Sequence, residues 1–198
     1  MLSLPNIKVI GVTGMSGAGK STVCRELSKY CDVVIDCDGV AREVSYNSLF
    51  LNELKERFSA EILNDNGTLN RTETARIIFS DDEKRTLYNQ IIFPYIIYEV
   101  IKKIKSANGI VLLDAPTLFE AQLDIVCTTI VSVTADFEIC AKRISQRDGI
   151  SPDSAKARLN SQHDALFFKE HSDHVLVNNG DYDSLCNDVL NLVEMIRW

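Results

Sequence analysis

A glycine-rich segment near the start of the chain has the residue types and spacing of a phosphate-binding loop. Gly14, four residues, then Gly19, Lys20 and Ser21 match the pattern GxxxxGK[ST] between an apolar run and a helix-forming segment. Glycines allow a positive φ and close approach, so successive backbone N–H groups can surround phosphate oxygens. Lysine adds a charge towards the β and γ phosphates, and the serine hydroxyl can ligate Mg²⁺. A glycine-rich turn that binds nothing is the alternative. We expect nucleotide phosphates to contact Gly17, Ala18, Gly19, Lys20, Ser21 and Thr22.

Three aspartates follow two other short apolar runs. Asp36 and Asp38 come after Val33 to Ile35, and Asp114 ends the run IVLLD. In a parallel α/β sheet these positions lie at the carboxyl edge, beside the phosphate loop. An aspartate there can orient an acceptor hydroxyl and accept its proton, and Asp114 can hold Mg²⁺ directly or through water. The alternative is that each aspartate only caps the element that follows it.

Arginines recur in the last third of the chain. Arg143 and Arg147 are four residues apart, hence on one helix face, and Arg158 lies in the next helix. Asp136 is a candidate cap for the first helix, and the Ser-Pro pair at 151–152 is a good start for the second. Guanidinium groups that fold over ATP would form a lid and stabilise transition-state charge. The alternative is that they decorate a solvated face.

The elements that would position these residues alternate between strands and helices. Five short apolar runs predict strands at Ile7–Thr13, Val33–Ile35, Ile110–Asp114, Ile125–Val133 and His174–Val177. Residues at helical spacing follow most of them, and an amphipathic helix closes the chain. The predicted fold class is α/β, with a five-stranded parallel sheet flanked by helices.

A helical insertion interrupts this alternation between about Gly39 and Asn108. A turn is expected at Asn64–Gly67, and a capped helix start at Asn70. An apolar stripe marks a longer helix later in the insertion, which Pro94 should kink or divide.

Composition limits the partners and the location. The 198-residue chain has a formal net charge of −7 and a pI near 5.0, which argues against nucleic acid as a partner. No run approaches the roughly 18 to 20 apolar residues that span a membrane, and the first residues lack a secretory-signal pattern. We therefore expect no membrane association and a cytoplasmic location. The six cysteines lack paired CxxC spacing and the three histidines form no HExxH motif, so buried thiols and ordinary histidines are expected.

Taken together, the motifs resemble those of the dephospho-CoA kinase family along nearly the whole chain. The similar segments are, in order, TGMSGAGKST, DCDGVARE, GTLNR, DAPTLFE, RISQRDGIS and VLVNNGD. The phosphate loop alone is shared by many proteins, whereas the aspartate pair before ARE, DAPTLFE and RxxxRD are more restrictive. The resemblance implies transfer of the γ-phosphoryl group of MgATP to the ribose 3′-hydroxyl of dephospho-CoA, the last step of coenzyme A synthesis.

The resemblance also implies roles for individual residues. Asp38 would be the base, with Asp36 as a supporting or alternative acid. Arg42 would hold an anionic part of the substrate and Arg71 would face the same pocket. Arg143 and Arg147 would be arginines of a lid, and Asn179 and Gly180 would lie in a loop near the adenine of ATP. Catalysis would depend on Asp38, Lys20 and Arg143. Phe93 stands where the family commonly has histidine, so no polar contact is carried over to that position.

A three-part organisation follows from this resemblance. Residues 1–40, 109–140 and 166–198 would form the nucleotide-binding core, 41–108 the helical substrate domain and 141–165 the lid. Two other functions stay open: another small-molecule P-loop kinase, and a nucleotide-gated binding protein that hydrolyses slowly. The absence of a guanine-reading NKxD segment disfavours a switch GTPase. The expected assembly is a monomer or a weak homo-oligomer.

Overall fold

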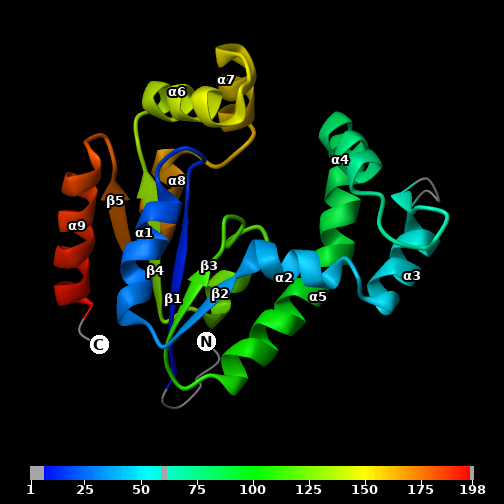
Figure 1. Cartoon of the computed structure of the whole chain (residues 1–198), viewed down its shortest axis with the longest axis horizontal. Helices are drawn as coiled ribbons and strands as arrows, with labels where there is room; N and C mark the ends of the chain where they lie inside the picture. Colours follow the sequence, from blue (N-terminus) through cyan, green and yellow to red (C-terminus); the bar gives the residue numbers. More distant parts are fainter. Residues whose placement is uncertain (1–6, 59–61, 197–198) are drawn as a thin grey trace.

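Five parallel strands form the centre of the molecule, in a computed structural model that describes residues 7–58 and 62–196 (Figure 1). The spatial order is β2-β3-β1-β4-β5, and each neighbouring pair is parallel. The strands are β1 (Ile7–Gly14), β2 (Val33–Asp36), β3 (Gly109–Asp114), β4 (Thr129–Thr134) and β5 (His174–Val177). The predicted α/β class with a five-stranded parallel sheet is confirmed. The predicted ends of the core at 1–6 and 197–198, and residues 59–61 of the predicted substrate domain, lie outside the described residues.

Helices surround this sheet and extend beyond it in two directions. They are α1 (Lys20–Leu27), α2 (Cys37–Val44), α3 (Ser48–Arg57), α4 (Arg71–Ser80), α5 (Asp82–Ser106), α6 (Phe137–Asp148), α7 (Pro152–Asn160), α8 (Ala165–His171) and α9 (Tyr182–Met195), with short 3₁₀ turns η1 (Ser28–Tyr30) and η3 (Leu123–Val126). In Figure 1, α6 and α7 stand above the sheet, and α3, α4 and part of α5 project to the right. The first group contains most of the predicted lid, residues 141–165, and the second lies within the predicted substrate domain, residues 41–108; the division into these parts stays a prediction.

Strand register brings the predicted acids to one edge of the sheet. Asp36 at the end of β2 is paired with Asp114 at the end of β3, and Asp114 is paired with Val12 near the end of β1. All strands are parallel, so their carboxyl ends share this edge with the glycine-rich loop that follows Gly14. Residues far apart in the sequence are therefore neighbours there.

Two apolar clusters pack against the sheet, and alternate side chains of β3 divide between them. Val111 and Leu113 belong to the cluster that includes α2 and α5, whereas Leu112 belongs to the cluster that includes α1, α6 and α9. This alternation follows from the two-residue period of a strand, and both faces are apolar because both are covered. The same arrangement explains why the strand runs are continuously apolar.

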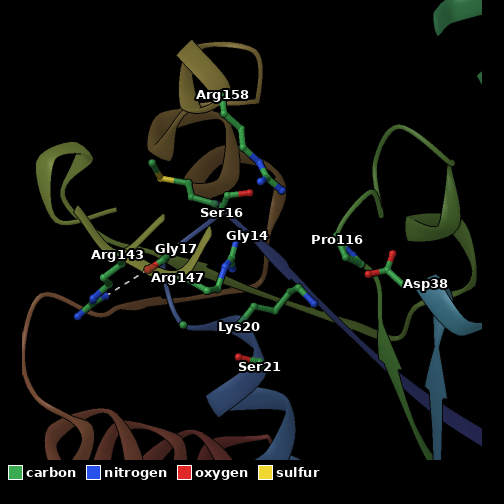
Figure 2. Close-up of a pocket in the computed structure, with 12 residues that line it drawn as sticks. Gly14, Ser16, Gly17, Lys20, Ser21, Asp38, Pro116, Arg143, Arg147 and Arg158 are labelled. Atoms are coloured by element: carbon green, nitrogen blue, oxygen red, sulfur yellow. Dashed lines mark hydrogen bonds between the residues drawn. The ribbon is translucent and has the colours of Figure 1, made fainter. Parts of the chain in front are cut away.

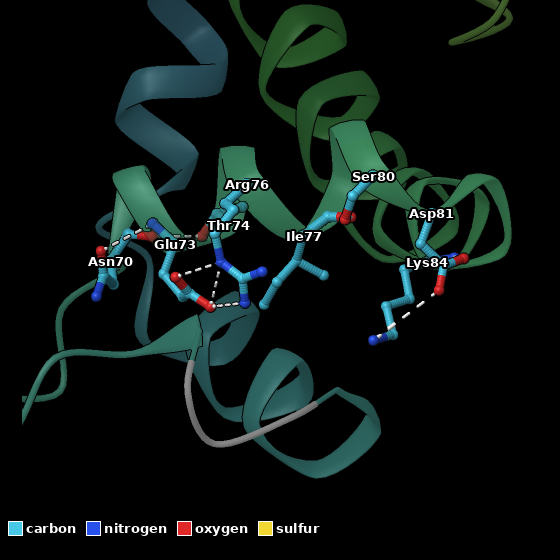
Figure 3. Close-up of polar contacts among 8 residues, drawn as sticks. All are labelled: Asn70, Glu73, Thr74, Arg76, Ile77, Ser80, Asp81 and Lys84. Carbon is cyan, nitrogen blue, oxygen red and sulfur yellow. Dashed lines mark hydrogen bonds and ion pairs between the residues drawn. The ribbon is translucent and has the colours of Figure 1, made fainter.

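The later part of the helical insertion consists of two helices, α4 and α5, and each has a capped N-terminus (Figure 3). Asn70 caps α4 by accepting from the N–H of Glu73 at 3.1 Å, which confirms the predicted start. Asp81, alone between α4 and α5, accepts from the N–H groups of Glu83 and Lys84. The predicted turn at Asn64–Gly67 is confirmed by a Gly67 N–H to Asn64 carbonyl bond of 2.8 Å.

Two expectations about helix and strand ends were wrong. The fourth strand begins at Thr129, because Gln122 adopts a left-handed φ of 53° and leads Leu123–Val126 into a 3₁₀ turn. An apolar run does not distinguish a strand from such a turn. The Asp136 carboxylate makes no cap bond to α6 but accepts from Asn179 at 2.8 Å. Of the two outcomes predicted for Pro94, division of the helix does not occur, because α5 continues from Asp82 to Ser106; a kink at Pro94 stays a prediction.

The remaining composition-based expectations concern the cysteines and the membrane. All six cysteines are free thiols, and four of them are buried. Burial raises the pKa of the Cys37 thiol to about 12, so this thiol stays protonated at neutral pH. Among residues 7–58 and 62–196, no helix is long and apolar enough to cross a lipid bilayer.

Candidate active site

The glycines of the phosphate loop are required by its conformation and its packing. Gly14, Gly17 and Gly19 have φ values of 140°, 77° and 104°. A Cβ on Gly14 would lie 2.1 Å from the carbonyl oxygen of Val133, and one on Gly19 would lie 2.4 Å from Nδ2 of Asn178. A side chain at either position would displace the neighbouring strand or loop. The loop leads into α1, which begins at Lys20. The N-terminal N–H groups of this helix face the same edge of the sheet.

A cavity of about 590 Å³ opens over this loop (Figure 2). Several predicted site residues line it together: Gly17, Gly19, Lys20, Ser21, Asp38, Arg143 and Arg147. Pro116 and Arg158 also line it. Figure 2 shows Asp38 and Pro116 on one side, Arg143 on the opposite side and Arg158 pointing in from α7. The structure thus places an ammonium, guanidinium groups and one carboxylate around a single cavity.

The two aspartates after β2 have different surroundings. Asp36 caps α2 by accepting from the N–H of Asp38 at 3.0 Å, and its other oxygen binds Arg42 at 3.0 Å. Asp38 lies in the first turn of α2 and faces the cavity. The alternative that each aspartate only caps the next helix therefore explains the position of Asp36, but it does not explain that of Asp38.

The pKa of the Asp38 carboxyl is raised above its usual range. The main cause is that protein atoms around the cleft displace water from it, although the side chain keeps an exposed surface. The negative charges of Asp36 and Asp114 act in the same direction, whereas Lys20 and Arg42 oppose the shift. A carboxylate with a raised pKa is a better proton acceptor than an ordinary surface aspartate.

Lys20 forms an ion pair with Asp114 at the foot of the cavity. Both side chains are largely buried, with 18% and 23% of their surfaces exposed. An ammonium has three donors, so the contact with Asp114 leaves two for phosphate oxygens. Asp114 itself is not among the residues that line the cavity. Its predicted role on Mg²⁺ stays a prediction, and the contact shown is with Lys20.

Arg143 links α6 to two loops at the edge of the sheet. Its guanidinium donates to the carbonyl of Asn178 at 3.0 Å and, at 3.4 Å each, to those of Gly17 and Gly180. It also lines a neighbouring cavity of about 260 Å³ with Gly19, Thr22 and Gly180. Arg143 therefore stands between the phosphate cavity and the loop expected near adenine.

Sequence reasoning missed Asn178 and Gln162, two amide side chains that hold the phosphate loop from outside. Asn178 is buried and donates to the carbonyl of Ala18 at 2.7 Å. Gln162 contacts Ser16 through two hydrogen bonds. The signal for Asn178 was its place directly after β5, at the same sheet edge; nothing local in the sequence marks Gln162.

A second cavity of about 310 Å³ adjoins the first. On α2, Asp38 lines the first cavity and Ala41, three residues later, lines the second. In the same way Pro116 lines the first cavity and its neighbour Thr117 lines the second. Arg42 and Arg71 line the second cavity together with apolar side chains, including Phe93. The guanidinium of Arg71 donates to the Ser45 hydroxyl at 2.8 Å and lies over the ring of Tyr46.

Tyr88 contributes a neutral hydroxyl to this second cavity. Burial raises its pKa to about 12, so the hydroxyl remains protonated and can donate a hydrogen bond. The second cavity thus combines cationic, apolar and neutral polar groups, which suits a ligand with anionic, apolar and amide parts.

Four of the predicted site residues line neither these two cavities nor the small one beside Gly180. They are Ala18, which is buried, Asp36, Asp114 and Asn179. The side-chain oxygen of Asn179 accepts from the N–H of Asp136 at 2.8 Å, so this residue fixes the loop path. Its neighbour Gly180 is the one with access to the cavity.

The donor set suits a magnesium ion that is bound mainly by phosphate. Ser21 lines the cavity and Asp114 contacts Lys20 beside it, so a hydroxyl and a carboxylate, which are hard oxygen ligands, lie close to the phosphate loop. Within the described ranges no cluster of three or more His, Cys, Asp or Glu residues could hold a metal by itself. Mg²⁺ commonly keeps waters and binds through one or two protein groups plus substrate phosphates, which fits this sparse set.

The sheet order, the glycine-rich loop before α1 and the arginine-bearing α6–α7 pair define a P-loop kinase. Shikimate kinase from Bacteroides thetaiotaomicron shares this fold at 16% identity, with a TM-score of 0.55 over 96% of this chain and 99% of that one. The model of the dephospho-CoA kinase family matches residues 8–184. The chain belongs to the dephospho-CoA kinase family and is an ATP-dependent kinase.

Individual relatives are similar in sequence to this chain over most of their lengths. Dephospho-CoA kinase of Staphylococcus aureus is 36% identical over 94% of this chain and 92% of the relative. Dephospho-CoA kinase of Arabidopsis thaliana is 34% identical over 90% and 79%, respectively. Among solved structures, TT1252 from Thermus thermophilus is 27% identical with a TM-score of 0.81, over 98% of this chain and 100% of that one. The resemblance inferred from the motifs is confirmed.

Proposed function

We propose that this protein transfers the γ-phosphoryl group of ATP to the ribose 3′-hydroxyl of dephospho-CoA, giving coenzyme A and ADP. The observation that carries the proposal is the common cavity of Lys20 and Asp38, beside a second cavity with two arginines. Membership of the dephospho-CoA kinase family supports the acceptor.

The phosphate loop would hold the donor. Its N–H groups and the N-terminus of α1 would bind the β-phosphate, and Lys20 would share its donors between Asp114 and the phosphates. Arg143, Arg147 and Arg158 would bring positive charge to the transferred group from the other side. Bound Mg²⁺, with Ser21 as its protein ligand and Asp114 acting through water, would neutralise charge on the β and γ phosphates.

Asp38 would act on the acceptor. Its carboxylate would accept a hydrogen bond from the 3′-hydroxyl and take the proton as the oxygen bonds to the γ-phosphorus. The bond between that phosphorus and the β–γ bridging oxygen breaks, and ADP leaves. Asp36 would support this role indirectly, because it caps α2 and so fixes the first turn from which Asp38 projects.

The second cavity would hold the rest of the acceptor. Arg42 and Arg71 would bind its diphosphate, and the apolar wall with Tyr88 would contact its remaining uncharged parts. The adenine of ATP would lie in the small cavity beside Gly180. We place the reaction in the cytoplasm and expect a monomer or weak homo-oligomer; cell fractionation and sedimentation test these two statements.

An acceptor survey tests the proposal. ADP release is measured with ATP, Mg²⁺ and one acceptor at a time: dephospho-CoA, AMP, CMP, shikimate or gluconate. We expect turnover with dephospho-CoA alone, and a product phosphorylated on the ribose 3′-oxygen. Turnover driven by AMP would favour another small-molecule kinase. ATP binding without stimulation by any acceptor would favour a nucleotide-gated binding protein.

A further inference from the structure

Gln162 lies in the segment that leads from α7 back to the core, and it joins the lid to the phosphate loop. Its Oε1 accepts from the main-chain N–H of Ser16 at 3.1 Å, and its Nε2 donates to the Ser16 hydroxyl at 3.0 Å. The same Nε2 donates to the main-chain carbonyl of Arg158 at 3.1 Å. One carboxamide therefore contacts the crest of the loop and the last turn of α7 together.

The partners leave this carboxamide only one orientation. A main-chain N–H meets an oxygen, and a main-chain carbonyl meets a nitrogen, so Ser16 and Arg158 fix both ends of the Gln162 amide. A carboxylate of the same shape would keep both contacts to Ser16 but would repel the Arg158 carbonyl. The site therefore requires an amide rather than any polar group of that length.

The contact completes a set of outside supports for the loop. Gln162 binds Ser16, Arg143 binds Gly17 and Asn178 binds Ala18, so three successive loop residues are each held by a distant side chain. Because these contacts order the loop before ATP arrives, less conformational entropy is lost when its phosphates bind.

The contact also sets the position of Arg158. Ser16 and the side chain of Arg158 line the same cavity, with Arg158 entering it from α7 (Figure 2). Because Gln162 ties the main chain of Arg158 to Ser16, the guanidinium starts from a fixed place relative to the loop. A displacement of about 1 Å in such a group can cost a large factor in rate.

We propose that Gln162 is a positioning residue that keeps Arg158 aligned with phosphates bound on the loop, so that lid and loop act as one unit during transfer. The proposal rests on the kinase function above. Gln162 touches neither reacting atom; it acts through Arg158 and Ser16.

A double-mutant cycle separates this role from a purely structural one. Gln162→Ala, Arg158→Ala and the double variant are compared by kcat and by KM for ATP, with Gln146→Ala as a matched control on an exposed face of the same lid. We expect Gln162→Ala to lower kcat about tenfold with a smaller change in KM, and to cost less than about twofold when Arg158 is already alanine. Equal costs in both backgrounds would overturn the proposal.

Gln162→Glu tests which contact matters. This variant keeps the acceptors for Ser16, so we expect equilibrium binding of ATP, titrated without acceptor, to stay within about threefold of the parent. Its kcat should fall about as far as that of Gln162→Ala, because the Arg158 contact is lost. A kcat equal to that of the parent would overturn the proposal.

Thermal melting of each variant controls for unfolding. If Gln162→Ala unfolds at a lower temperature than the parent, the kinetics of the two proteins are compared at a temperature at which both are folded. The Gln162→Glu variant then gives an independent test of the proposal. Failure of the parent protein to phosphorylate dephospho-CoA would refute the proposed function instead, so the two failures are distinguishable.

Discussion

At the scale of single residues, the site depends on what surrounds each carboxylate. Asp36, Asp38 and Asp114 lie at one sheet edge, yet Asp36 caps a helix, Asp114 binds Lys20 and only Asp38 faces the cavity. The raised pKa of Asp38 follows from that place. Two consequences can be measured.

Asp38→Asn should separate catalysis from binding and stability. We expect turnover to fall about a hundredfold or more, because the amide cannot accept the proton. ATP binding should change little. Since folding raises the pKa of Asp38, the ionised form contributes no stability at neutral pH, and the variant should melt at or slightly above the parent's temperature.

Asp36→Ala is the comparison for this variant. It removes the cap of α2 and should cost about 1 kcal/mol of stability, with a smaller loss of turnover. If Asp36→Ala abolished turnover while Asp38→Asn left it unchanged, the base would be Asp36.

The pH profile gives an independent check on Asp38. The base must be ionised, so kcat/KM should fall as the pH drops through the pKa of this carboxyl, and that limb should lie above the usual range for aspartate. A bound triphosphate adds negative charge, which moves the limb of kcat further in the same direction. The limb should be absent from the residual rate of Asp38→Asn. Its persistence there would assign it to another group.

At the scale of elements, one acid binds an arginine from each of the helices α6 and α7. Asp148, the last residue of α6, accepts from Arg147 at 2.7 and 3.0 Å and from Arg158 at 2.9 Å. The hydrogen bond from Arg147 is the main reason that the pKa of Asp148 is lowered. Both guanidinium groups line the phosphate cavity, so one carboxylate orients two cations from neighbouring helices.

Asp148→Asn should therefore weaken catalysis more than stability. We expect kcat/KM for ATP to fall about tenfold, or about 1.4 kcal/mol of transition-state stabilisation, since neither arginine keeps its orientation. The melting temperature should change little, because exposed ion pairs contribute at most about 1 kcal/mol. Asp153→Asn, on an exposed site of α7, is the control. A faster variant would mean that Asp148 competes with ATP for the arginines.

At the scale of the molecule, the helices that are predicted to bind the substrate share a core with the sheet. One apolar cluster contains Leu113 of β3, Val40 of α2, Phe50 of α3 and Ile96 of α5. The predicted boundary between core and substrate domain at residue 40 or 41 therefore falls within a packed cluster. The division itself stays a prediction, and we expect the two parts to unfold together.

Phe50→Ala tests this continuity. Phe50 is fully buried and packs edge-on against Tyr88 and Tyr95, with ring centroids 6.3 and 5.7 Å apart. We expect a loss of about 3–5 kcal/mol in urea unfolding, still in one transition. Because Tyr88 lines the second cavity, KM for dephospho-CoA should rise more than KM for ATP. Tyr98→Ala, on the exposed face of α5, is the control; an equal effect there would refute the argument.

The sequence by itself determined the sheet, the phosphate loop and the family, because those signals are local. A buried parallel strand must be continuously apolar, and a loop that encloses phosphate needs glycines before a helix. Only the tertiary structure decided which of the three aspartates faces the cavity, where the fourth strand begins, and that Gln162 reaches Ser16 across 146 positions. Those outcomes depend on contacts between distant segments, and the residues that make them carry no local pattern.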